Sequence, residues 1–385
     1  MRCWGNGGSG RLGTGSTDTI GDDEPASQGK VVALGGPAEQ ISAGAEHTCA
    51  VLKSGAVRCW GSGRDGRLGY GNKEDVGDNE LPEAAGDVPV GAKVVQVAAG
   101  GRHTCALRES GAVRCWGDGS EFRLGLGGEG PADENNIGDD ESVQSVPAVQ
   151  FNEKVQQIAI DSARTCVLFQ NGKVRCWGPI WGEDRYSSRF ERPARLRPDA
   201  RIGESVASLG RGRNHICAVT SKRGVRCWGM AGVPGDPMGY SDVSVIYVDP
   251  PDGSYPTPAK LGDVSGITDA VQVAGGDNHT CVLLGSGRVR CWGKARTGAL
   301  GFGGPDHWGG DNTVPREASD TVRPKDGAEL SFPAKARQIV AGVFFTCALL
   351  EDDTVRCWGS SESGQLGYGS KDTVWDATKA PPVPL

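Results

Sequence analysis

The sequence predicts an all-β fold built from repeated units, and three observations support this prediction. The tripeptide Cys-Trp-Gly occurs seven times, at spacings of 51 to 66 residues. Each occurrence after the first follows another cysteine by ten positions. Glycine accounts for 61 of the 385 residues, which indicates many tight turns rather than long helices. Units of this length with several short strands are typical of propeller blades. The tripeptides begin at Cys3, Cys59, Cys115, Cys176, Cys227, Cys291 and Cys357.

The first strand expected in each unit is short and rich in small residues. It reads Gln-Ile-Ser-Ala-Gly over 40–44 and Gln-Val-Ala-Ala-Gly over 96–100. Small side chains suit a position where several backbones approach one another, such as the axis of a propeller. We therefore expect this strand to be the innermost of its unit. The corresponding segments are 157–161, 206–210, 272–276 and 338–342.

The next two strands are expected to form a β-hairpin that carries the two cysteines. In the copy at 49–59, apolar runs precede and follow Gly55, which predicts a three-residue loop with a left-handed glycine. This register places Cys49 opposite Cys59 at a non-hydrogen-bonded position, where Cα atoms approach to roughly 4.5–5.5 Å. Such a separation permits a disulfide. The left-handed position is expected at Gly55, Gly111, Gly172, Gly224, Gly287 and Asp353.

The thirteen cysteines leave three interpretations. Cross-strand disulfides are favoured, and they would imply an oxidising compartment. Buried thiols are the alternative, because free cysteine packs as a small apolar residue. Metal binding is disfavoured, because no Cys-x-x-Cys knuckle is present. The expected pairs are Cys49–Cys59, Cys105–Cys115, Cys166–Cys176, Cys217–Cys227, Cys281–Cys291 and Cys347–Cys357, which leaves Cys3 unpaired.

Each hairpin is followed by a Gly-rich loop, a Pro-containing stretch and an expected outer edge strand, which gives four strands per unit. The order of these submotifs resembles the repeat of the regulator of chromosome condensation family, in its bacterial cysteine-containing type. Residues 46–71 carry the whole pattern, and its closing Gly-x-Leu-Gly-x-Gly element returns at 10–15, 298–303 and 364–369. The segments near 179–186 and 230–240 lack a clear copy of that element.

The resemblance covers nearly the whole chain. It implies a single seven-bladed β-propeller over residues 1–385, whose first blade is incomplete. We number the repeats one to seven in chain order. Their ranges are near 1–38, 39–93, 94–153, 154–203, 204–269, 270–335 and 336–385.

Charge and composition exclude several functions. The net charge of −7 has the wrong sign for a general binder of nucleic acids or anionic membranes. No apolar run is long enough to span a bilayer. No zinc-protease helix, serine elbow or P-loop is present, and the Gly-x-Gly-x-x-Gly segments at 5–10 and 61–66 precede no helical pattern. We therefore expect no catalytic centre, no cofactor and no metal site.

The start of the sequence predicts an upstream segment. Met1 occupies the place that a valine holds before Arg-Cys-Trp in the other copies, and no apolar stretch of a signal peptide follows it. We expect two further strands, a partner for Cys3 and a signal peptide upstream, and hence a location in the periplasm, on the cell surface or in the medium. An authentic start with an incomplete blade is the alternative.

Three kinds of repeated polar residue have open roles. The acidic loops 20–24, 76–80 and 137–141 fit turn chemistry, with Ca²⁺ binding as the alternative. One repeat position holds a histidine four times and Arg164 or Phe345 otherwise, which favours packing or hydrogen bonding over base catalysis. An arginine precedes each Cys-Trp and is expected to bond between blades, with anion capture as the alternative. The histidines are His47, His103, His215 and His279.

Aromatic residues on the longest or most divergent connections are the candidate binding residues. Such residues either anchor a partner or pack their own loops, and the sequence favours neither role. They are Trp181, Tyr240, Tyr247, Tyr255 and Trp308.

We therefore expect a monomeric, non-catalytic binding or scaffold module outside the cytoplasm, with a protein partner and no nucleic acid. One alternative is a guanine nucleotide exchange factor for a small GTPase, as the family resemblance implies. The other is a carbohydrate or cell-envelope binder or hydrolase that uses the acidic loops.

Overall fold

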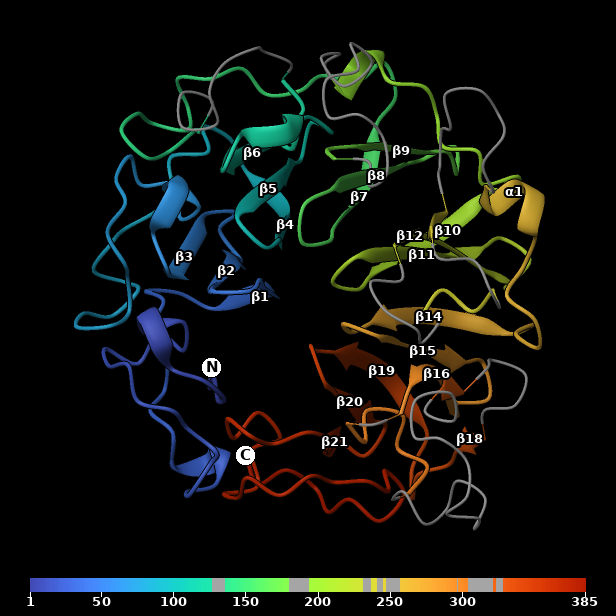
Figure 1. Ribbon diagram of the computed structural model, residues 1–385. Helices are drawn as coiled ribbons and strands as arrows, with labels where there is room; N and C mark the ends of the chain where they lie inside the picture. Colours follow the sequence, from blue (N-terminus) through green and yellow to red (C-terminus); the bar gives the residue numbers. More distant parts are fainter. Residues whose placement is uncertain are drawn as a thin grey trace. The chain divides into compact units, whose positions relative to one another are not determined.

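The computed structural model confirms an all-β fold (Figure 1). It describes residues 1–126, 136–179, 194–230, 237–240, 245–246, 257–295, 297–303, 321–322 and 328–385. Within these residues the one α-helix is α1, Pro258–Leu261, whose first turn begins with the helix-compatible Pro258 after the capping Thr257. None of the described helices has the length and apolar character needed to cross a membrane.

The chain forms two compact units. The first comprises Met1–Thr19 and Gly29–Ala200, and the second comprises Ile20–Gln28 and Arg201–Leu385. Each unit contains three antiparallel sheets, one for each of repeats two to seven. The described residues therefore show six blade-like sheets rather than the expected seven. Residues 1–34 form turns and isolated bridges instead, because they hold no counterpart of the first two strands.

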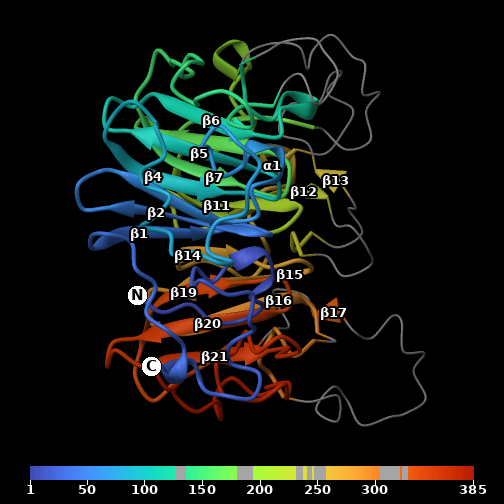
Figure 2. The ribbon, with the colours of Figure 1, turned by 90° about the vertical axis from the view of Figure 1, so that its left-hand side faces the viewer.

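The described part of the first unit contains nine strands. Figure 2 shows the sheets β1–β3 and β4–β6 as successive layers, and β1 and β2 both contact β4. The strands are β1 Ala38–Ala43, β2 His47–Leu52, β3 Val57–Gly61, β4 Val94–Ala99, β5 His103–Arg108, β6 Val113–Gly117, β7 Val155–Ile160, β8 Thr165–Phe169 and β9 Val174–Trp177.

The second unit contains twelve described strands. They are β10 Val206–Arg211, β11 His215–Thr220, β12 Val225–Met230, β13 Val245–Ile246, β14 Ala270–Gly275, β15 His279–Leu284, β16 Val289–Lys294, β17 Thr321–Val322, β18 Glu329–Leu330, β19 Ala336–Ala341, β20 Phe345–Leu350 and β21 Val355–Gly359.

The predicted hairpin register is confirmed. Cys49 lies opposite Cys59, Ala50 opposite Arg58 and Val51 opposite Val57. All six expected cysteine pairs form disulfides, with Cα atoms 4.0–4.1 Å apart, slightly closer than expected. Cys3 has a free thiol.

One turn assignment was wrong. The left-handed residue of the hairpin in repeat five is Arg223, with φ of 65°, rather than Gly224. The hairpin register fixes that position four residues before Cys227, so the turn tolerates a strained non-glycine residue there. Asp353, with φ of 65°, fills the equivalent place as expected.

The described residues show an outer fourth strand in only some repeats. Repeat five adds β13 to its sheet, and repeat six adds β17 and β18. The described part of repeat three has a bridge at Val113–Val149. In the described parts of repeats two, three and seven, an isolated bridge at the glycine that ends the third strand takes the place of a fourth strand. These bridges are Gly61–Val76, Gly117–Ile137 and Gly359–Val374.

The core is dominated by the hairpin tryptophans and the disulfides. Trp60, Trp116, Trp228, Trp292 and Trp358 are all 1% exposed or less. The first strands are close together as predicted: β4 contacts β1 and β7 in the first unit, and β14 contacts β10 and β19 in the second.

Candidate functional site

A single backbone carbonyl joins the hairpin to the preceding repeat in five of the six described hairpins. The indole Nε1 of Trp60 donates to the Arg11 oxygen at 3.0 Å, and the Thr48 hydroxyl donates to the same oxygen at 3.1 Å. The acceptor lies in the Gly-x-Leu-Gly turn of the repeat before. The same shared acceptor returns at the carbonyls of Arg67, Arg123, Pro237 and Ala299.

The acceptor at Pro237 corrects the expectation that the segment 230–240 lacks the closing element. Met238 is fully buried where other copies have leucine, and Gly239 has φ of 82°. Tyr240 follows, and its hydroxyl accepts from the Cys227 amide and donates to the Gly262 carbonyl. Pro-Met-Gly-Tyr therefore replaces Gly-x-Leu-Gly-Tyr.

The buried Tyr240 bonds the backbone of its own repeat. Its side chain corresponds to Tyr70 and Tyr368, whose hydroxyls bond the backbone of Cys59 and Cys357. The other candidate binding residues, Trp181, Tyr247, Tyr255 and Trp308, lie outside the described residues.

The histidines form bridges between consecutive repeats. His47 Nε2 lies 2.8 Å from the Thr104 hydroxyl, which itself donates a hydrogen bond to the Arg67 carbonyl. Because the hydroxyl has only one hydrogen to donate, the imidazole Nε2 must be the donor in the bridge. The other bridges are His103–Thr165, His215–Thr280 and His279–Thr346.

Burial favours the neutral form of His103 and His279. Desolvation lowers the pKa of His279 to about 3, and it lowers the pKa of His103 well below its usual range, helped by electrostatic interactions with Arg123, His47 and Arg67. A fully buried imidazole that reaches no solvent cannot exchange a proton with a substrate. The predicted packing and hydrogen-bonding role is therefore the one the geometry supports.

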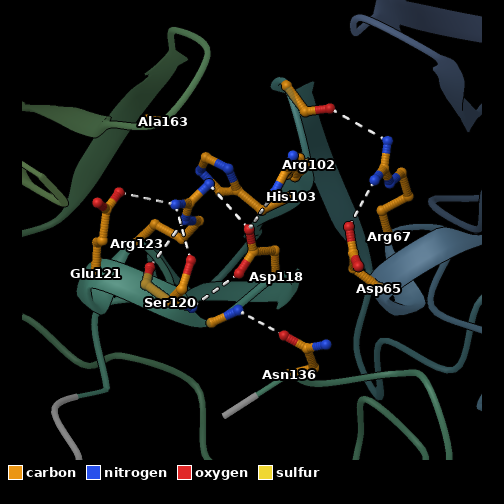
Figure 3. A network of polar contacts seen from close by, with 12 residues as sticks. Asp65, Arg67, Arg102, His103, Asp118, Ser120, Glu121, Arg123, Asn136 and Ala163 are labelled. Carbon is orange, nitrogen blue, oxygen red and sulfur yellow. Dashed lines mark hydrogen bonds and ion pairs between the residues drawn. The ribbon is translucent and has the colours of Figure 1, made fainter. Parts of the chain in front are cut away.

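Buried arginines stabilise the turns that follow β3 and β6 (Figure 3). The Arg67 guanidinium, 2% exposed, bonds the Asp65 carboxylate at 2.6 Å, the Glu46 carboxylate at 3.2 Å and the Arg64 carbonyl. Arg123 bonds Glu121 and Ser120 in the same way. These charge-assisted bonds fix both turns on the rigid sheets below.

Figure 3 also shows how the second of these turns is held from its other side. The Asp118 carboxylate accepts from the Ser120 amide and lies 3.2 Å from the Arg123 guanidinium, while the Gly119 amide donates to Asn136. Arg102, whose side chain is 65% exposed, lies 3.8 Å from Asp118. The turn therefore has a buried ionic base and an exposed charged surface.

A hollow of about 400 Å³ lies beside the first turn. Its charged members carry both signs, and Glu46, Arg64 and Lys73 are exposed. Its walls hold no histidine, cysteine or metal-binding group of carboxylates, so the lining offers hydrogen bonds and charge but no activated nucleophile. We call it the charged hollow. Its lining residues are Ser9, Glu46, Ser62, Arg64, Lys73 and Asp75.

Sequence reasoning missed this site. A signal was present, because the pattern Gly-x-Gly-x-x-Gly-Arg occurs at both 5–11 and 61–67. As predicted, the glycine-rich segments form turns, here the 3₁₀ turns η1 Gly8–Gly10 and η3 Arg64–Gly66. The unrecognised feature was the arginine after each turn, whose side chain donates to a carbonyl of that turn.

The acidic loops cap backbone amides. The Glu80 carboxylate accepts from the Gly77 amide and the Glu141 carboxylate accepts from the Gly138 amide. The Gly77 carbonyl in turn accepts from Gly15 of the preceding repeat. These contacts support the turn interpretation for the loops 76–80 and 137–141.

The arginines before Cys-Trp bond the outer segments. Arg58 pairs with Asp87 of its own repeat at 2.8 Å. Arg226 pairs with Asp263 of its own repeat and also donates to the Ile202 carbonyl of the repeat before. The expected bonding between repeats is therefore found at Arg226, whereas Arg58 is bonded within its repeat.

Comparison with known proteins agrees with this geometry. The sequence pattern of the RCC1-like domain matches residues 1–384. The chain is 27% identical to the ultraviolet-B receptor UVR8 of Arabidopsis thaliana, over 95% of this chain and 74% of UVR8. It is also 27% identical to the human E3 ubiquitin-protein ligase HERC2, over 87% of this chain but only 6% of HERC2.

A solved structure supports the fold independently. Prp20p of Saccharomyces cerevisiae is 21% identical and superposes with a TM-score of 0.72, over 100% of this chain and 85% of Prp20p. The repeated Cys-Trp-Gly hairpins, the shared carbonyl acceptors and the match along the chain lead to one assignment. The protein belongs to the RCC1-like domain family.

Proposed function

We propose that this chain is a non-catalytic protein-binding propeller that acts as a scaffold outside the cytoplasm. The observation that carries the proposal is the charged hollow, in which exposed side chains of both signs stand on a rigid base. Mixed charge favours recognition of a protein surface through complementary charges, whereas a polyanion would require a surface of one sign.

The base of the charged hollow is preorganised. Arg67 is buried and bonds Glu46 and Asp65, so the wall that carries Glu46 is held without a partner present. Preorganised side chains lose less conformational entropy on binding, which is how a scaffold keeps affinity with a small contact area.

The proposed location rests on the six disulfides. Each joins neighbouring strands within one buried hairpin. Disulfides at this density persist in oxidising compartments and are rare in the cytosol. The proposal therefore places the protein in the periplasm, on the cell surface or in the medium.

A relative gives precedent for protein binding in this fold. The structure of Prp20p was reported together with its binding properties to Gsp1p and histones. We extend to this chain only the class of ligand, a folded protein, and not the identity of either partner.

The test is charge reversal in the charged hollow. Arg64→Glu with Lys73→Glu reverses two exposed cations, and envelope proteins of the producing organism are captured on the immobilised chain after mild cross-linking. The matched control, Lys53→Glu with Lys93→Glu, makes the same charge change at exposed lysines near the opposite ends of the strands. We expect the wild type and the control to retain a defined partner that the first variant loses by about tenfold or more. Equal capture by all three proteins would refute the role of the charged hollow.

Exchange-factor activity is the second candidate. The reported binding of Prp20p to Gsp1p favours it, and the disulfides oppose it because they indicate an oxidising compartment. The deciding measurement is the release of labelled GDP from candidate small GTPases. Acceleration by catalytic amounts of this chain would favour the exchange factor over the scaffold.

A further inference from the structure

Most of the arginines that precede Cys-Trp are paired with an acid of their own repeat. In repeats two, four, five and six, the guanidinium bonds a carboxylate at 2.7–2.8 Å. Each acid stands directly before the residue that pairs with the valine at the start of the third strand, so the four acids share one repeat position. The pairs are Arg58–Asp87, Arg175–Asp199, Arg226–Asp263 and Arg290–Glu329.

Repeat three has no acid at this position. Val149 pairs with Val113 at the start of β6, so the residue before it, Ala148, is the equivalent of Asp87. The arginine of this repeat, Arg114, is only 6% exposed. Its buried Nε atom has no hydrogen-bond acceptor among the described residues. Repeat three therefore keeps the buried cation and lacks the carboxylate that compensates it elsewhere, which is a costly arrangement for a folded protein.

A second cation lies beside Arg114. Arg108 ends β5 at a position where the other hairpins have leucine, phenylalanine or threonine. Ala106 lies opposite Arg114 and two residues before Arg108, so both arginine side chains are on the same face of the hairpin. Arg108 donates to the Val90 carbonyl of repeat two, but its buried Nε also has no acceptor in the described part of the chain.

The electrostatics of the two guanidinium groups agree with this geometry. Burial and the charge of Arg108 lower the pKa of Arg114 to about 10, and burial lowers the pKa of Arg108 as well. A neighbouring carboxylate would have the opposite effect, because it favours the charged form of arginine. Arg114 nevertheless stays protonated at neutral pH. Repeat three thus presents two uncompensated positive charges where repeat two has Leu52 and a neutralised arginine.

We propose that Arg114 and Arg108 form a binding site for a carboxylate supplied by a ligand, at the position that the Asp87 carboxylate occupies in repeat two. The Asp87 side chain is 56% exposed while it bonds Arg58, so a group at this position can arrive from solvent. Two sources present this group on a short stem, namely a small organic acid and an aspartate or glutamate side chain of a protein. The inference concerns a different surface from the charged hollow and does not depend on the proposed protein-binding function.

The unbonded edge of Arg114 suits a carboxylate. In repeat four, Arg175 uses its Nε and Nη2 atoms to bond one Asp199 oxygen, at 3.2 and 2.7 Å. Arg114 donates to the Val143 carbonyl through Nη1, which leaves the Nε edge for a ligand. A planar carboxylate matches the planar guanidinium edge. Since Ala148 differs from aspartate by one carboxylate group, the site takes a ligand with a single such group rather than a polyanion.

The first test restores the acid from within the chain. Ala148→Asp places a carboxylate on the stem that repeats two, four and five use, and we expect it to raise the melting temperature by about 2 °C or more. Ala148→Asn is the matched control, because it has nearly the same shape without the charge. It should gain about half as much or less, since charge-assisted hydrogen bonds are roughly twice as strong as neutral ones.

The second test measures binding to the wild-type chain. Sodium acetate replaces sodium chloride at constant ionic strength, and the Nε–Hε signals of ¹⁵N-labelled arginine are followed by NMR. We expect a saturable shift that is lost in Ala148→Asp, whose own carboxylate fills the site. The peptide acetyl-Gly-Asp-Gly-amide is titrated in the same way, and whichever probe binds more tightly identifies the source of the carboxylate.

The proposal makes three demands that can each fail. Acetate and the aspartate peptide must shift the arginine signals saturably, and the matching peptide acetyl-Gly-Asn-Gly-amide must bind at least about tenfold more weakly than its aspartate counterpart. Equal shifts in the wild type and in Ala148→Asp would show that the carboxylate binds elsewhere. Equal melting temperatures of Ala148→Asp and Ala148→Asn would show that Arg114 has no need of a charge. Any of these results would overturn the proposal.

Discussion

His47 Nε2 lies 2.8 Å from the Thr104 hydroxyl, so a histidine of one repeat donates to a threonine of the next. The Thr104 hydroxyl donates a hydrogen bond to the Arg67 carbonyl, which also accepts one from the Trp116 indole. Three segments, from β2, β5 and the turn after β3, thus meet at the buried hydroxyl oxygen of Thr104. This arrangement gives the stack of sheets a specific register in addition to apolar contact.

Replacing one bridging histidine should flatten the acid side of the stability profile. Burial holds the pKa of His279 at about 3 in the folded protein, while an unfolded histidine has a pKa near 6.5. The unfolded chain therefore binds the proton first, and the free energy of unfolding falls as the pH drops from about 6.5 toward 3, by up to about 1.4 kcal/mol per pH unit. His279→Gln removes this contribution. Chemical unfolding at pH 7.5, 6, 5 and 4 measures the two slopes, and superimposable slopes would contradict the prediction.

The glycine beneath a bridging imidazole should not tolerate a methyl group. A Cβ atom at Gly276 would lie 2.1 Å from His279 Cε1 and 2.5 Å from the Gly342 carbonyl. Both neighbours are fixed, so Gly276→Ala should lower the free energy of unfolding by about 2–4 kcal/mol. The control is Gly36→Ala, whose Cβ would have an ordinary 3.6 Å contact with Leu52. Thermal unfolding of both variants tests this, and similar losses would show that crowding at the ring is not the cause.

Removing one hairpin disulfide should weaken the fold without abolishing the register. Cys105→Ser with Cys115→Ser opens a closed loop of separation ten, which the chain-entropy account values at about 2–3 kcal/mol. Cys3→Ser, which breaks no disulfide, is the control and should lower stability by less than the double variant does. Urea unfolding gives the free energies. An unchanged midpoint in the double variant would mean that packing alone holds this hairpin.

The buried arginine under the charged hollow should contribute far more to stability than its exposed neighbour. Arg67→Ala leaves the Asp65 and Glu46 carboxylates without their cation and the Arg64 carbonyl without a donor. We expect a loss of about 2–4 kcal/mol. Arg64→Ala removes an exposed side chain of the same turn and should stay within about 0.5 kcal/mol. Differential scanning calorimetry of the pair tests the contrast, which disappears if the turn is held by its backbone alone.

Local features of the fold were predictable from the sequence because they depend on residues close together in the chain. The ten-residue cysteine spacing and the turn at Gly55 determine the register that places Cys49 opposite Cys59. The glycine-rich turns follow from the same local patterns. Arg223 was missed because a glycine next to it suggested a different turn position.

The histidine bridges between repeats were not predictable, because they join residues 57 to 67 positions apart. The sequence shows His47 and Thr104, but nothing in it states that they meet. The role of Tyr240 was left open for a related reason. Its segment does not match the Gly-x-Leu sequence of the other copies. It nevertheless keeps a buried side chain at Met238 and a carbonyl acceptor at Pro237, which the next hairpin uses.

The shared carbonyl acceptors also bear on how such a chain changes its copy number. Trp116 and Thr104 donate to a carbonyl oxygen of the preceding repeat that is equivalent to the one bonded by Trp60 and Thr48. A duplicated repeat of this kind therefore carries both the donors and the acceptor of the contact. Unequal recombination within the gene can therefore lengthen or shorten the array without inventing a new interface. Arg164 differs from the bridging histidines, since it stands in their position and bonds Asp161 of its own repeat, and repeat four should be the least interchangeable of the series.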